Sequence, residues 1–175
     1  MDNTIIGAAR IASNAHYGQT RSGGESYINH PMRVAHTTMM VQGIDPEIVA
    51  AAWLHDVVED TSMALVDIRF VFGNVVADLV YDMTNMYTSK AYPNMKRKER
   101  KERECVRLAH TNSWAVHTIK LADRYDNLYD LLNRDRKWAK KYLRESMALH
   151  AALTLGDQRL RERLKCRIDE LGEIL

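Results

Sequence analysis

The stretch AAWLHDVVEDT, residues 51–61, turns from apolar to strongly polar within one helical turn. Its first four residues are apolar, His55 and Asp56 follow directly, and Glu59 and Asp60 come one turn later. On a continuous helix residues i and i+4 share a face, so we expect His55 beside Glu59 and Asp56 beside Asp60. Burying unpaired carboxylates is costly, and a divalent cation that offsets their charge is one solution. The alternative is an amphipathic helix whose acidic side faces water.

Two further polar residues occur where an isolated side chain would need a partner. His30 lies in YINHP at the entrance to a predicted helix, and Asp123 lies in IKLADRYDNL after an apolar run. Taken singly, each is typical of a capping, core or helix-face residue. Together with His55 and Asp56 they form a set of two imidazoles and two carboxylates, which suits one divalent transition metal. The donor set fits Mn²⁺, Fe²⁺, Co²⁺, Zn²⁺ or Ni²⁺ and does not choose among them.

Helical spacing of apolar residues runs through most of the chain, and this predicts an all-α fold. Pro31 and Pro46 suit the first turns of helices, whereas Gly43 ends one helix and Gly73 divides two others. The predicted helices cover residues 3–15, 31–42, 46–59, 64–72, 74–84, 94–110, 114–131, 136–155 and 157–172.

The composition is that of an ordinary globular chain. Its 175 residues, 46% of them hydrophobic, predict a single domain over 1–175 with about eight to ten helices. A net charge of +2 gives no general electrostatic case for binding nucleic acid or a membrane. The N-terminus lacks the pattern of a signal peptide, and Cys105 and Cys166 form no disulfide framework, so we expect a cytoplasmic protein. A homo-oligomer is compatible with the two C-terminal helices.

The run KRKERKERE, residues 96–104, is the most charged part of the chain. One interpretation is a solvated helix face that carries ion pairs between residues i and i+4. The other is that some of these lysines and arginines contact an anionic ligand. The sequence leaves both open.

The order of these motifs resembles the HD phosphohydrolase superfamily, and in detail the hydrolase domain of the RelA/SpoT family and its small stand-alone alarmone hydrolases. The matching stretches are AHYGQTRSGGESYINHPMRVA (15–35), AAWLHDVVEDT (51–61), IRFVFGNVVADLVYDMT (68–84) and IKLADRYDNL (119–128). They place a motif-bearing core at about 5–132, followed by C-terminal helices at about 136–172. The resemblance implies a mostly helical fold with a single Mn²⁺ held by His30, His55, Asp56 and Asp123.

The same resemblance implies the remaining roles at the site. Glu59 and Asp60 would position and activate the attacking water, and Asn127 would contact the bound nucleotide. The family reaction removes pyrophosphate from the 3′ position of ppGpp or pppGpp. In the early loop Arg21 would stack on the purine, whereas Ser22 stands where relatives usually have a lysine.

Three functions follow from the sequence. The first is hydrolysis of a purine nucleotide that bears a 3′-pyrophosphate, either ppGpp or a ppApp-like relative. The second keeps the chemistry but acts on nucleoside monophosphates, deoxynucleoside triphosphates or NADPH, and the replacement at Ser22 motivates it. The third is a nucleotide-binding or scaffold protein without turnover. Its sequence mark would be the loss of a ligand or of Glu59 and Asp60, and all are present.

Overall fold

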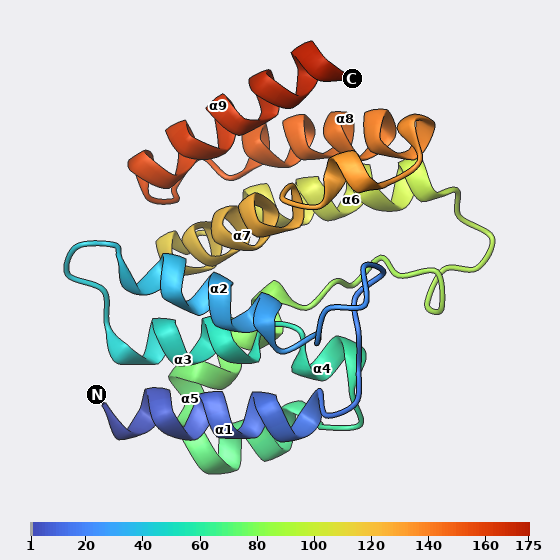
Figure 1. Ribbon diagram of the computed structural model, residues 1–175. Coiled ribbons are helices and arrows are strands. Elements are labelled where there is room, and N and C mark those ends of the chain that lie inside the picture. Colours follow the sequence, from blue (N-terminus) through green and yellow to red (C-terminus); the bar gives the residue numbers. More distant parts are fainter. Residues whose placement is uncertain (1) are drawn as a thin grey trace. The chain divides into compact units, whose positions relative to one another are not determined.

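The computed structural model describes residues 2–175, and over this range the chain is built of helices (Figure 1). Within the same range no strand forms beyond one isolated antiparallel bridge between Thr20 and Ser26. The prediction of an all-α fold is therefore confirmed. The elements are α1 (Asn3–Ala15), α2 (Asn29–Met39), α3 (Pro46–Leu54), α4 (Val57–Asp60), α5 (Leu65–Met83), α6 (Arg97–His110), α7 (Trp114–Asn127), the 3-10 helix η1 (Leu131–Asn133), α8 (Arg136–Ala152) and α9 (Gln158–Ile174).

Contacts divide the chain into two compact units, one ending at Thr84 and one running from Asn85 to Leu175. The first unit holds α1 to α5, and the second holds α6 to α9. A single domain over residues 1–175 stays a prediction. Across residues 2–175, none of the helices combines the length and the apolar character needed to cross a lipid bilayer.

Helix α3 is the centre of the first unit and packs against α1, α2 and α5. Ala50, Ala51 and Ala52 on this helix are fully buried, and so is Leu54 at its end. Small side chains let neighbouring helices approach closely, so α3 supplies a rigid support for the residues that follow it. His55 and Asp56, the first polar residues of the stretch 51–61, follow directly after Leu54 at the end of this helix.

The predicted helix over 46–59 is wrong in one respect that matters for the site. Helix α3 ends at Leu54, and a short separate helix, α4, begins at Val57. The carbonyl of Ala52, which a continuous helix would pair with the Asp56 N–H, accepts a hydrogen bond from His55 Nδ1 at 2.8 Å. Asp56 then has φ −103° and ψ −6°, so the chain turns between the two helices. His55 and Glu59 consequently do not lie on one uninterrupted helix face.

The predicted division at Gly73 is correct. Helix α5 is interrupted there by a residue with φ 81° and ψ −177°, a backbone conformation that glycine adopts at low cost. Helix α7 ends at Asn127, four residues before the predicted boundary, and η1 follows at Leu131–Asn133. The two C-terminal helices lie close to their predicted ranges.

In the second unit α8 packs against α6 and α9, and α7 packs against α9. The loop between α8 and α9 lies directly against α7. A methyl group at Gly156 would overlap Leu121 Cδ1 and would approach the carbonyl carbon and oxygen of His117 to 3.1 and 3.2 Å. Because one of these neighbours is backbone, relaxation is limited and the position requires glycine.

We therefore expect Gly156→Ala to lower the free energy of unfolding by about 1–3 kcal/mol, the usual cost of overpacking. Urea denaturation measures this change. Gly172→Ala on α9 is the matched control, since its added methyl would lie 3.9 Å from Leu143, an ordinary contact. That variant is expected to gain up to about 1 kcal/mol from helix propensity. Equal stability of the two variants would contradict the packing argument.

Candidate metal centre

Three candidate ligands of the first unit converge on one point. His55 Nε2 lies 3.1 Å from Asp56 Oδ2, His30 Nε2 lies 3.5 Å from the same oxygen, and the two imidazole nitrogens are 3.3 Å apart. Ligands about 2.1 Å from a common ion are about 3.0 Å apart at right angles and about 3.4 Å apart at tetrahedral angles. The three atoms therefore fit around one divalent cation.

The orientation of His55 favours metal binding over an ordinary core role. Its side chain is fully buried, and Nδ1 faces the Ala52 carbonyl oxygen at 2.8 Å. Nδ1 must therefore carry the hydrogen, so in the neutral ring Nε2 presents a lone pair toward His30 and Asp56. A backbone carbonyl that fixes the tautomer of an imidazole is the usual support of a metal-bound histidine.

The electrostatics of Asp56 keep it available as an oxygen ligand. Burial by itself would raise the pKa of this carboxyl group. When the imidazoles are protonated and no ion is bound, the positive charge of His55, with hydrogen bonds from His30 and His55, outweighs burial and holds the pKa well below its usual value. Asp56 is thus ionised at neutral pH beside two imidazoles.

Tyr27, which no sequence motif indicated, links this cluster to Asp60. Its hydroxyl lies 2.7 Å from Asp56 Oδ2 and 2.8 Å from Asp60 Oδ2, as a donor shared by both carboxylates. Burial and the two neighbouring carboxylates raise the pKa of Tyr27 far above its usual value, so the phenol stays neutral and keeps its proton. The only signal in the sequence was its place three residues before His30.

Asp60 is also held through its backbone. Gln19 Nε2 donates to the Asp60 carbonyl at 2.8 Å, and Gln19 Oε1 accepts from His16 Nδ1 at 2.8 Å. His16 is buried and stacks on Tyr27 with ring centroids 4.7 Å apart. Tyr27 therefore holds the side chain of Asp60 and Gln19 holds its main chain. Both of these residues lie within residues 16–27.

The remaining predicted site residues lie in two places. Glu59 is half-buried on α4 in the first unit. Asp123 lies on α7 in the second unit, where Asn127 Nδ2 donates to its Oδ1 at 2.5 Å and Lys120 Nζ lies 3.8 Å from its Oδ2. The roles of Asp123 as fourth ligand, of Asn127 as nucleotide contact and of Glu59 stay predictions.

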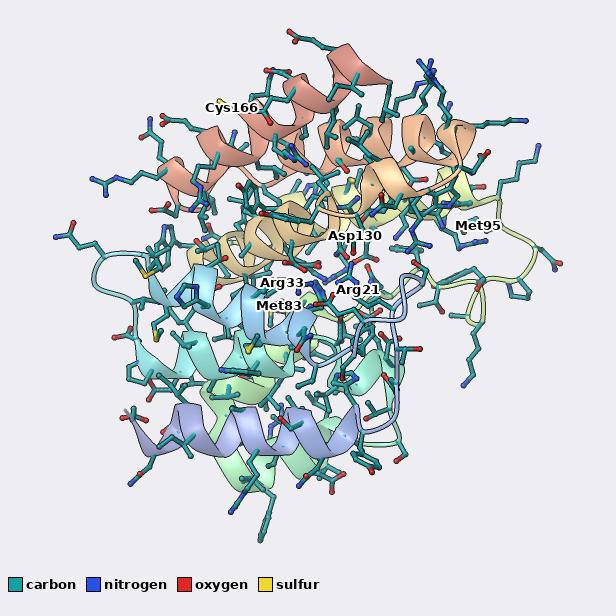
Figure 2. All side chains as sticks on the ribbon, in the orientation of Figure 1. Arg21, Arg33, Met83, Met95, Asp130 and Cys166 are labelled. Carbon is teal, nitrogen blue, oxygen red and sulfur yellow. The ribbon has the colours of Figure 1, made fainter. Side chains whose placement is uncertain are left out.

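The loop that carries Arg21 and Ser22 is a closed turn rather than an open segment. The Arg21 N–H donates to the Glu25 carbonyl at 2.8 Å, and the Tyr27 N–H donates to the Gln19 carbonyl at 3.0 Å. The Glu25 carboxylate accepts two hydrogen bonds from Arg33 on α2, at 2.6 and 3.2 Å. Figure 2 labels Arg21 on the loop and Arg33 on the helix.

Removing this ion pair is expected to loosen the loop. In Arg33→Met we expect amide hydrogen exchange to accelerate several-fold over residues 21–27, because the carboxylate of Glu25 loses both hydrogen bonds from Arg33 and keeps the one from Asn29. The hydrogen bonds from Arg33 lower the pKa of Glu25, so the pair holds at neutral pH. It is lost as the pH falls through that lowered value. We therefore expect the amide exchange rates of the wild type, corrected for their intrinsic pH dependence, to approach those of Arg33→Met only at acid pH.

The control for that experiment is Arg69→Met, which removes an exposed ion pair of similar length, 2.7 Å, between Arg69 and Asp78 on α5. Exchange over residues 21–27 should not change in this variant. Unchanged exchange in Arg33→Met would show that the backbone hydrogen bonds and the contact from Asn29 hold the turn without the ion pair.

The family model of the HD domain matches residues 8–156. The bifunctional (p)ppGpp synthase/hydrolase SpoT of Escherichia coli K12 is 34% identical over 166 residues, which cover 93% of this chain and 22% of that protein. A GTP pyrophosphokinase of Streptomyces coelicolor is 37% identical over 150 residues, 83% of this chain and 17% of that protein. The chain thus spans about a fifth of the length of these two relatives.

Two other relatives match along their whole length. The guanosine-3′,5′-bis(diphosphate) 3′-pyrophosphohydrolase MESH1 of Mus musculus is 35% identical over 177 residues, covering 96% of this chain and 94% of that protein. The solved structure of a metazoan ortholog of SpoT, a protein that hydrolyzes ppGpp, superposes with a TM-score of 0.85. It is 26% identical and covers 98% of this chain and 97% of its own.

Proposed function

This chain belongs to the HD-domain family, and from that membership and the geometry of its metal centre we propose that it is a metal-dependent phosphohydrolase. Its proposed reaction removes pyrophosphate from the 3′ position of a purine nucleotide such as ppGpp, pppGpp or ppApp. The observation that carries the proposal is the convergence of His30, His55 and Asp56 on one point, with Asp60 joined to Asp56 through Tyr27. The name of the full-length relative MESH1, a guanosine-3′,5′-bis(diphosphate) 3′-pyrophosphohydrolase, supports the same reaction, and the SpoT ortholog of similar structure is described as hydrolyzing ppGpp.

We propose Mn²⁺ as the native ion, with Asp123 as its fourth protein ligand. Two imidazoles and two carboxylates suit this ion, and Fe²⁺, Co²⁺, Zn²⁺ and Ni²⁺ are the alternatives that metal analysis would distinguish. When bound, such an ion supplies a water of lowered pKa and offsets the charge of the phosphate. In the second unit Asn127 donates to Asp123, so it orients this carboxylate as well as offering a contact to the nucleotide.

Residues around the metal ligands would activate the water and bind the nucleotide. Asp60, held by Tyr27 and Gln19, would orient the attacking water and accept its proton, and Glu59 one residue earlier would share that task. Arg21 offers a planar guanidinium that can stack on a purine. Ser22 beside it offers a hydroxyl where a lysine would offer a charge. A cytoplasmic location fits the two free cysteines.

A turnover assay with Mn²⁺-supplemented protein under anaerobic conditions tests the proposal. The substrates are ppGpp, pppGpp, ppApp, NADPH and the common nucleoside monophosphates and deoxynucleoside triphosphates, with products separated by ion exchange. We expect release of pyrophosphate from the alarmones and none from Asp56→Ala. Turnover of ordinary nucleotides or NADPH alone would keep the site and discard the alarmone substrate. Binding without turnover under any of the metals would leave a nucleotide-binding protein.

A further inference from the structure

The turn that follows α1 brings two polar side chains together, beside α4 (Figure 1). The Gln19 N–H donates to the His16 carbonyl at 3.0 Å, and between these residues Gly18 has φ 78°. A turn with a positive φ at its third residue favours glycine there. With the chain turned in this way, the side chain of Gln19 meets the imidazole at the end of α1, and His16 Nδ1 lies 2.8 Å from Gln19 Oε1.

Gln19 extends this contact to the end of α4. The last carbonyl groups of a helix have no hydrogen-bond partner within that helix, and α4 ends at Asp60. Gln19 Nε2 donates to the Asp60 carbonyl at 2.8 Å. A side chain from the turn after α1 therefore caps α4 at the residue that would accept the proton of the attacking water.

These two contacts decide which nitrogen of His16 carries the hydrogen. A carbonyl group only accepts, so Gln19 must present its NH₂ group to Asp60 and its oxygen to His16. His16 Nδ1 is then the donor, and in the neutral ring Nε2 carries the lone pair. Nε2 is buried and has no hydrogen-bond partner within residues 2–175. Over that range, the bond to Gln19 is thus the single hydrogen bond of the imidazole.

An imidazole is costly at this buried position. His16 is 1% exposed, and its ring stacks on Tyr27 with centroids 4.7 Å apart. A phenylalanine ring would offer a similar stack without an unsatisfied nitrogen. What histidine adds is the donor to Gln19. The hydrogen bond, and not the packing, is therefore the property for which this position needs an imidazole.

The ring of His16 also bears on the carboxylate of Asp60. Tyr27, which stacks on this ring, donates its hydroxyl to Asp60 Oδ2 at 2.8 Å. The His16 N–H donates to the Ala12 carbonyl at 3.0 Å, which anchors the residue on the last turn of α1. One buried ring thus contacts both residues that hold Asp60, the one at its main chain and the one at its side chain.

We propose that His16 is a positioning residue for Asp60. The proposal rests on the proposed function, in which Asp60 accepts the proton of the attacking water. His16 acts through Gln19, which holds the main chain at the end of α4, and through Tyr27, which holds the carboxylate. A proton acceptor that is displaced from its productive position works more slowly. The contribution of His16 is therefore to kcat, and not to KM or to metal binding.

Two substitutions separate the hydrogen bond from the packing. His16→Phe keeps an aromatic ring against Tyr27 and removes the donor, whereas His16→Asn keeps an N–H donor one bond from Cγ, where Nδ1 lies, and removes the ring. We expect kcat to fall about tenfold in His16→Phe and to stay within about threefold of the wild type in His16→Asn, with KM and metal content unchanged.

The melting temperatures of the two variants should follow the opposite order. His16→Phe is expected to melt at the wild-type temperature or above it, because the substitution removes a buried unsatisfied nitrogen. His16→Asn is expected to melt lower, because it leaves a cavity beside Tyr27. A kcat that fell in parallel with the melting temperature would assign His16 a packing role alone and overturn the proposal.

Hydrogen exchange at the end of α4 tests the same link without turnover. The N–H groups of Asp60 and Thr61 donate to carbonyl groups one turn earlier, at 2.9 and 3.2 Å. We expect their exchange to be several-fold faster in His16→Phe and near the wild-type rate in His16→Asn. The matched control is His36→Phe, the same substitution at an exposed histidine of α2, which should leave this exchange unchanged. Equal exchange in wild type and His16→Phe would overturn the proposal.

The Asp60→Asn background shows whether His16 acts through Asp60. If it does, adding His16→Phe to Asp60→Asn should lower kcat no further, because the group that His16 positions is already gone. An undiminished loss in that background would place the action of His16 elsewhere and overturn the proposal. Absence of turnover in the wild type would defeat the proposed function alone, since the exchange experiment would still decide whether His16 holds the end of α4.

Discussion

Replacing Asp56 by asparagine is expected to remove the metal ion and the activity together. The Asp56 carboxylate lies 3.1 Å from His55 Nε2 and 3.5 Å from His30 Nε2. Asparagine keeps the size of the side chain but offers a neutral oxygen, which is a poorer ligand for a divalent cation. We expect turnover to fall by about a thousandfold or more, the order of loss when a charge-stabilising group is removed.

Two measurements check the Asp56→Asn variant. Elemental analysis after dialysis gives the metal content, which should fall from about one ion per chain to near zero. Added Mn²⁺ should raise the melting temperature of the wild type and leave that of the variant unchanged, because an ion stabilises only a fold that binds it. Asp78→Asn is the matched control, since it neutralises an exposed carboxylate of α5. A variant that retained both metal and turnover would remove Asp56 from the metal centre.

The sequence predicted most of the fold because the relevant signals were local. Gly73 divides α5 where predicted, since the backbone conformation it adopts depends on the residue itself. The break between α3 and α4 was missed, because apolar residues continue at helical spacing through Val57. At that break the His55 ring takes the place of a backbone N–H at the Ala52 carbonyl, and helical periodicity carries no information about such a bond.

The candidate site likewise contains residues that the sequence indicated and one that it did not. His30, His55 and Asp56 were found because polar side chains in apolar surroundings need a partner. Tyr27 gave no such signal, since tyrosines are common at the edge of a core, and its link between Asp56 and Asp60 is a tertiary contact.

The charged helix α6 carries the ion pairs of a solvated face, and contact of its other cations with an anionic ligand stays a prediction. Lys98 lies 3.8 Å from Glu102, and Arg103 pairs with Glu99 at 3.0 Å, as a solvated face predicts. Lys101 instead turns toward basic neighbours on the protein side and has no ion pair across residues 2–175. The sequence could not distinguish it, because neighbouring lysines of one helix look alike until the packing of α8 is known.

The second large effect is expected from Asp60→Asn, which should lose turnover while keeping the metal. Asp60 is exposed. Its carboxylate is connected to Asp56 through the hydroxyl of Tyr27, from which both carboxylates accept, and not through an imidazole of the metal centre. If it accepts the proton of the attacking water, its loss should lower kcat by about 10² to 10⁴-fold. Metal content and melting temperature should stay at their wild-type values, which separates this variant from Asp56→Asn.

Tyr27→Phe shows whether the position of Asp60 matters as well as its charge. The phenyl ring can keep its stack on His16, so the variant removes only the hydrogen bonds to the two carboxylates. We expect a fall in kcat of about tenfold, smaller than that of Asp60→Asn because the proton acceptor is still present but less well oriented. Glu59→Gln completes the comparison. If Asp60→Asn turned over normally and Glu59→Gln did not, Glu59 would be the proton acceptor, and the contacts of Tyr27 and Gln19 with Asp60 would serve only to hold the loop against α4.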